Sequence, residues 1–142
     1  MQLAAMQTCA GRVILRSVGT RCLIVDDNPR FLRSARNLLE RQGVRVVGVA
    51  STQSEAMAIA ASDRPDVALV DVDLGEENGL DVARALAASD EPVPVILISA
   101  YGEPEIQDVL EDSPACGFLP KSIVSRRAIV DLLHRADESH PS

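Results

Sequence analysis

The chain has 142 residues, which suits a single domain of ordinary size, and 46% of them are apolar, enough to build a sizeable core. Its formal net charge of −7 argues against binding nucleic acid through a general positive field. No apolar stretch reaches the roughly 18 residues that a membrane span needs, and the N-terminal segment lacks the basic region of a signal peptide.

The first 19 residues show no pattern that assigns them to the fold, so we expect residues 1–19 to form a flexible extension. The three cysteines are widely spaced and match no metal-ligand pattern, which predicts reduced thiols in a cytoplasmic protein. Cys22 and Cys116 lie in strand-like runs, and we expect both to be buried.

From residue 20 onward, short apolar runs alternate with stretches of helical periodicity. Asn28 can cap the first helix, with Pro29 at its first position and Gly43 just past its end. The remaining predicted helices are 51–62, 79–89, 103–112 and 124–136. The predicted strands are 22–25, 44–49, 67–70, 93–98 and 115–119.

Five strands alternating with five helices predict an α/β fold. Because the strands are apolar on both faces, the sheet should be parallel and covered on both sides by helices. The expected architecture is a (βα)5 doubly wound three-layer sandwich with a five-stranded parallel sheet, which is flavodoxin-like. The domain should span residues 20–136, followed by a polar, frayed tail at 137–142.

Polar side chains directly follow four of the five predicted strands. Asp26 and Asp27 come after the first strand, Asp71 after the third, Ser99 after the fourth and Lys121 after the fifth. Because the carboxyl ends of parallel strands meet at one edge of the sheet, we expect these five side chains to lie close together.

This set of residue types points to phosphoryl transfer. Clustered carboxylates without His or Cys form a hard oxygen site that suits Mg²⁺. Asp71 is placed centrally and can act as a nucleophile toward phosphorus, while Lys121 and Ser99 can bind phosphoryl oxygens. Each residue alone has an ordinary explanation, such as helix capping or a solvated surface charge. All five at one topological position favour the functional interpretation.

The same residues resemble the receiver domain of two-component response regulators, and the resemblance covers about residues 20–136. The segment DLGEENGLD, in which Gly79 opens the third helix, is also similar to the loop that follows the phosphoacceptor in that family. The residues that carry the resemblance are Asp26-Asp27, Asp71, Ser99-Ala100 and Lys121.

The resemblance implies a role for each position. Asp71 would accept a phosphoryl group from a histidine kinase or a phosphotransfer protein, and Lys121 would pair with one phosphoryl oxygen. Asp27 and Asp71 would ligate Mg²⁺ directly, Asp26 mainly through a metal-bound water, and the backbone carbonyl of Asp73 would be a further ligand.

The resemblance also implies a switch. Ser99 would move toward the phosphoryl group, and Phe118 would rotate inward with it. The surface made by residues 103–112, 115–119 and 124–136 would then change and bind a partner or a second copy of the chain as a homodimer.

Two other functions remain open at this point. The Asp71-x-Asp73 pattern after a strand also resembles phosphatases of the haloacid dehalogenase type, although their second acidic pair should follow the Lys and here it precedes the nucleophile. A pseudo-receiver that never carries phosphate is the other alternative. A receiver would have only self-phosphorylation and autodephosphorylation activity, and it would be either a stand-alone protein or the receiver part of a transcription regulator, without binding nucleic acid or a membrane itself.

Overall fold

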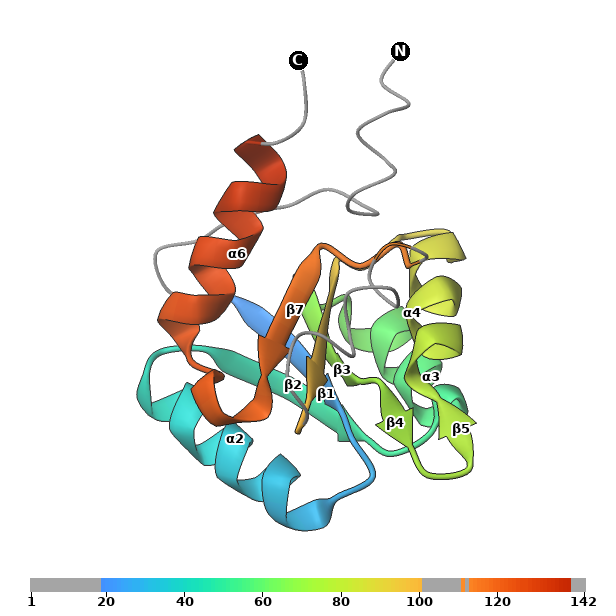
Figure 1. Cartoon of the computed structure of the whole chain (residues 1–142), viewed down its shortest axis with the longest axis horizontal. Coiled ribbons are helices and arrows are strands. Elements are labelled where there is room, and N and C mark those ends of the chain that lie inside the picture. Colours follow the sequence, from blue (N-terminus) through green and yellow to red (C-terminus); the bar gives the residue numbers. More distant parts are fainter. Residues whose placement is uncertain (1–18, 101–110, 112, 139–142) are drawn as a thin grey trace.

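The computed structural model describes residues 19–100, 111 and 113–138, and a parallel five-stranded sheet forms its centre (Figure 1). The strand order is β2-β1-β3-β6-β7, with β2 and β7 at the two edges. This order confirms the predicted doubly wound sheet, and it reverses between β1 and β3, where such sheets place their binding sites. The strands are β1 (Arg21–Val25), β2 (Arg45–Ala50), β3 (Val67–Asp71), β6 (Val95–Ser99) and β7 (Gly117–Pro120).

Helices cover both faces of the sheet (Figure 1). On one face lie α2 (Pro29–Arg41) and α6 (Arg126–Glu138), and on the other lie α3 (Gln53–Asp63) and α4 (Gly79–Ala88). The fourth predicted helix, residues 103–112, lies outside the described residues except for Glu111. None of the described helices is long and apolar enough to cross a membrane.

The apolar runs form a central sheet because their side chains alternate between two cores. In β1, Leu23 and Val25 pack toward α3 and α4, whereas Cys22 and Ile24 pack toward α2 and α6. All residues of β3 and β6 are buried. Such continuous burial explains why these runs lack the polar alternation of a half-exposed sheet.

The predicted ends of the first helix are confirmed. The Asn28 side chain accepts hydrogen bonds from the amides of Arg30 and Phe31 at 3.0 and 3.3 Å, and Pro29 is the first helical residue. Gly43, just past the helix, has a φ of +93°, which a residue with a Cβ rarely adopts. At the other end of the chain, α6 runs to Glu138, two residues beyond the predicted end.

The cysteines agree only in part with the sequence prediction. Cys22 is free and fully buried, and burial, together with the nearby charge of Asp66, raises the pKa of its thiol to about 12. Cys116 is half-buried, so the prediction that it is buried is wrong for this residue. The segment 1–18, which includes Cys9, lies outside the described residues.

Candidate functional site

The carboxyl ends of β1, β3, β6 and β7 meet around a pocket of about 210 Å³. Asp71 is the last residue of β3 and Ser99 the last of β6, while Lys121 follows β7 directly. Asp27, two residues past β1, also lines the pocket. Strand register alone therefore brings residues separated by up to 94 positions (27 to 121) into one site.

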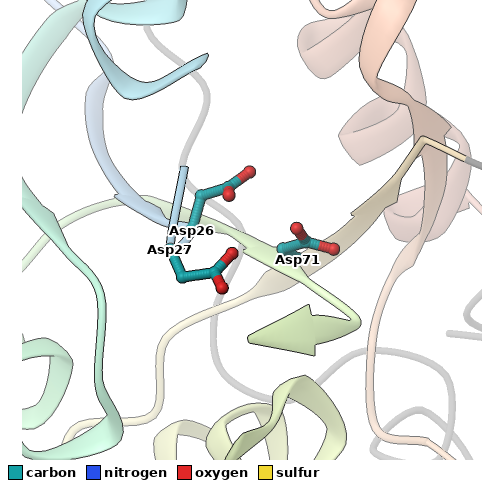
Figure 2. A group of neighbouring side chains, drawn as sticks. All are labelled: Asp26, Asp27 and Asp71. Carbon is teal, nitrogen blue, oxygen red and sulfur yellow. The ribbon is translucent and has the colours of Figure 1, made fainter. Parts of the chain in front are cut away.

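Three carboxylates lie close together at this edge of the sheet (Figure 2). Each of Asp26, Asp27 and Asp71 offers one oxygen, and these oxygens lie within 4.8 Å of one another. Asp26 is fully buried and Asp71 is 5% exposed, whereas Asp27 is exposed. Because like charges this close repel, the cluster needs a cation to balance it.

Lys121 supplies part of that balance. Its Nζ lies 2.7 Å from Asp26 Oδ2 and 2.9 Å from Asp71 Oδ2, and the lysine side chain is only 17% exposed. The short turn η2 (Lys121–Ile123) places this lysine over the end of the sheet. Apart from this ion pair, Asp26 Oδ2 has no polar partner among the described residues.

Backbone amides fix the other oxygens of the two buried acids. Asp26 Oδ1 accepts a hydrogen bond from the Asn28 amide at 2.9 Å, and Asp71 Oδ1 accepts one from the Asp73 amide at 3.0 Å. Both carboxylates are therefore held in one orientation, with Oδ2 turned to Lys121. Asp73 itself is exposed, and its Oδ1 accepts from the Gly75 amide at 3.0 Å.

The pKa values of Asp71 and Lys121 reflect this arrangement. Burial raises the pKa of Asp71 above its ordinary value, and the charge of Asp26 adds to the rise, while the Asp73 amide and Lys121 oppose it. Burial alone would lower the pKa of Lys121, but its hydrogen bonds and its attraction to Asp26 and Asp71 outweigh burial and raise it. Lys121 therefore stays charged beside Asp71 at neutral pH.

The two predicted switch residues are both buried. Ser99 is 1% exposed at the end of β6 and pairs with Pro120 of β7. Phe118 is 8% exposed and belongs to the core on the α3 and α4 face, so its ring occupies an inward position.

Two glycines shape the rim of the site. A Cβ on Gly75, whose φ is +77°, would lie 2.9 Å from Asp27 Oδ2. A Cβ on Gly79 would lie 1.9 Å from the backbone oxygen of Asp71, which lets α4 begin directly against the end of β3. Sequence reasoning noted Gly79 but missed Gly75. Gly75 lies in the two-residue turn between β4 (Asp73–Leu74) and β5 (Glu77–Asn78), and a glycine in such a short turn was the signal that could have identified it.

Sequence reasoning also missed an aromatic contact. The Nζ of Lys121 lies over the ring of Phe31, 4.8 Å from its centroid. The ring also packs partly against the core on the α2 and α6 face of the sheet. Nothing in the sequence pairs it with a lysine 90 positions away (31 to 121).

The donor set fits a magnesium ion. All the available ligand atoms are carboxylate or carbonyl oxygens, and no His or Cys lies among the clustered ligands of the described residues. Asp26 Oδ2 is buried, and among the described residues its ion pair with Lys121 is its one polar contact, which favours metal binding independently of any resemblance.

Comparisons with known proteins agree with this geometry. Residues 22–134 match the family described as the response regulator receiver domain. The chain is 41% identical over 96 residues to the phyllosphere-induced regulator PhyR of Methylorubrum extorquens, covering 66% of this chain and 36% of PhyR. It is 33% identical over 126 residues to the transcriptional regulatory protein NarL of Mycobacterium tuberculosis, covering 86% of this chain and 58% of NarL.

A solved structure gives the same result. The signal receiver domain of NarL from Mycobacterium tuberculosis superposes with a TM-score of 0.70 at 32% identity, covering 86% of this chain and 98% of that domain. The chain thus spans only about a third to three fifths of the two regulators it matches, but nearly all of the isolated domain.

Proposed function

Because this chain belongs to the response regulator receiver domain family, the phosphoacceptor module of two-component signalling, we propose that Asp71 is its phosphorylation site. The phosphoryl donor would be a phosphohistidine on a histidine kinase or a phosphotransfer protein. One observation carries the assignment. Asp71, at the end of the central strand β3, forms an ion pair with Lys121, as Asp26 does, and it is one of three carboxylates with oxygens within 4.8 Å of one another.

The transfer uses the groups in the pocket. Asp71 Oδ2 forms the new bond to phosphorus while the bond from phosphorus to the donor nitrogen breaks, and the imidazole leaves as the neutral base, keeping the proton on its other ring nitrogen. Lys121 then exchanges its contact with Asp71 for one phosphoryl oxygen, and the Ser99 hydroxyl donates to another. Mg²⁺, held by Asp26, Asp27, Asp71 and the backbone carbonyl of Asp73, would supply positive charge for the phosphoryl oxygens.

We further propose that Ser99 and Phe118 pass the phosphorylation signal to the surface. The two residues lie on neighbouring strands, β6 and β7, so a movement of one can displace the other. In this proposal Ser99, once bonded to the phosphoryl group, holds the Phe118 ring in its inward position. The surface made by β7 and α6 would then favour a partner or a homodimer.

The activity of the whole protein depends on what this receiver is attached to or binds. We propose that it acts in the cytoplasm, where ATP supplies the kinase, and that it is either a stand-alone receiver or the receiver part of a transcription regulator. Its net charge of −7 disfavours direct contact with nucleic acid. Apart from its own phosphorylation and dephosphorylation, we propose no turnover of small substrates.

The proposal is tested by measuring intact mass after incubation with acetyl phosphate and Mg²⁺. The wild-type chain should gain one base-labile phosphoryl group, and Asp71→Asn should gain none while unfolding at a similar temperature. Size-exclusion of both samples then reports any change in assembly. Phosphorylation that persists in Asp71→Asn would refute the assignment, and steady turnover of p-nitrophenyl phosphate would favour the phosphatase alternative.

A further inference from the structure

Phe31 lies in the first turn of α2, next to the phosphorylation pocket. Its amide is held by the Asn28 side chain at 3.3 Å, in the same loop that fixes Asp26 through the Asn28 amide at 2.9 Å. The position of the Phe31 backbone is therefore tied to the position of a pocket carboxylate.

The side chain of Phe31 is only half-buried, unlike those of Ala35 and Leu39, which form the core face of the same helix. Part of its ring packs on the core between the sheet and α6, and the ring face lies under the Lys121 ammonium, 4.8 Å from its centroid. This distance is within the range in which the negative face of an aromatic ring attracts a cation.

The ring differs from the other two partners of Lys121. Asp71 becomes phosphorylated, so its contact with the lysine must be exchanged during transfer, and Asp26 lies in the proposed metal cluster. Phe31 carries no charge and takes part in neither event. It can therefore keep the ammonium in place while the lysine's contact moves from the carboxylate to the phosphoryl oxygen.

We propose that Phe31 is a positioning residue for phosphoryl transfer, acting through the contact of its ring face with the Lys121 ammonium. The proposal rests on the function proposed above, because it requires that Lys121 binds a phosphoryl oxygen. Without the ring, the long lysine side chain can adopt more conformations in the pocket, and fewer of them point at the phosphoryl group.

The test replaces Phe31 by phenylalanines that carry one, two and three ring fluorines. Fluorination keeps the shape of the ring but withdraws electron density from its face, so a packing role predicts no trend. The rate of phosphorylation by phosphoramidate at saturating Mg²⁺ should fall steadily along the series, while the unfolding temperature stays constant. Phe31→Leu should be about three- to tenfold slower than wild type, and Phe31→Tyr should restore the rate.

Two controls make the outcome specific. Leu32→Ala removes a neighbouring half-buried side chain that packs on the same core, and it should lower the unfolding temperature without a matching loss of rate. The NMR signals of the Lys121 ε-methylene protons should be shifted by the ring in the wild-type chain, and this shift should disappear in Phe31→Leu.

The outcomes separate the two proposals. A wild-type chain that is phosphorylated, combined with equal rates across the fluorinated series, would overturn the role of Phe31 and leave the proposed function intact. An unchanged ε-methylene shift in Phe31→Leu would do the same. A wild-type chain that takes no phosphoryl group would overturn the proposed function, and this inference with it.

Discussion

Replacing Gly79 by Ala should damage the phosphorylation site through the backbone alone. Gly79 is the first residue of α4, and its amide donates to the Val72 carbonyl at 3.0 Å. An added Cβ would lie 1.9 Å from the Asp71 carbonyl oxygen and 2.8 Å from Val72 Cα. Both neighbours are backbone atoms, so no side-chain rotation can relieve the contact.

The size of the effect follows from that distance. Moving from 1.9 Å to an ordinary contact of about 3.4 Å requires a shift of about 1.5 Å between α4 and the end of β3. Strain of about 1–3 kcal/mol and the loss of one hydrogen bond worth about 1 kcal/mol are partly offset by the better helix propensity of Ala. We expect Gly79→Ala to be about 2–3 kcal/mol less stable than wild type. Because Asp71 moves with its backbone, phosphorylation should slow by about tenfold or more.

Urea unfolding and the rate of phosphorylation by acetyl phosphate measure the two effects. The matched control is Gly48→Ala in β2, where the added Cβ would meet only the Ile59 side chain at 2.9 Å. Because a half-buried side chain can move aside, this variant should keep the wild-type rate and lose about 1 kcal/mol or less. If Gly79→Ala matched wild type in both stability and rate, the close approach of α4 to Asp71 would not matter as argued.

Three further predictions follow from charges and caps. In EDTA, Asp27→Asn should stabilise the fold by about 1 kcal/mol, because it removes one of three clustered charges. Mg²⁺ should raise the unfolding temperature of this variant less than that of wild type, and equal Mg²⁺ effects would contradict a shared metal site. The raised pKa of Lys121 means that its contribution to stability is complete below 10.5, its ordinary value, and is lost as pH rises through the higher folded value. The difference in unfolding free energy between wild type and Lys121→Met should therefore shrink at alkaline pH, and a difference that grew would refute this sign. Gln42→Ala removes the acceptor that holds the Arg126 amide at 2.7 Å, so it should cost about 0.5–1.5 kcal/mol by urea unfolding, whereas Gln42→Glu should cost little.

The sheet and the acidic site could be predicted because both follow from short-range patterns. Each buried strand is a continuous apolar run, and in a parallel sheet the residue after such a run reaches the same edge as its counterparts. Asp26, Asp71 and Lys121 were placed in one site for that reason, and the structure brings them into direct contact.

The features that sequence reasoning missed depend on tertiary packing. The turn at residues 121–123 is too short to show periodicity. The Gln42 side chain accepts a hydrogen bond from the Arg126 amide, and these two residues are 84 positions apart in the sequence. In α4, Val82 is fully buried, whereas Leu80 is only half-buried. Apolar residues cover a wide arc of this helix, so the sequence pattern alone does not fix its rotation about its own axis. Packing against the sheet determines that rotation.

The edge strand β7 limits the ways in which this receiver can associate. It has only four residues, Gly117 to Pro120. An incoming strand would find only a short ladder, which is a common protection against edge-to-edge aggregation and strand exchange. Complexes on this side of the molecule should therefore form through side-chain contacts, without a continuous intermolecular sheet.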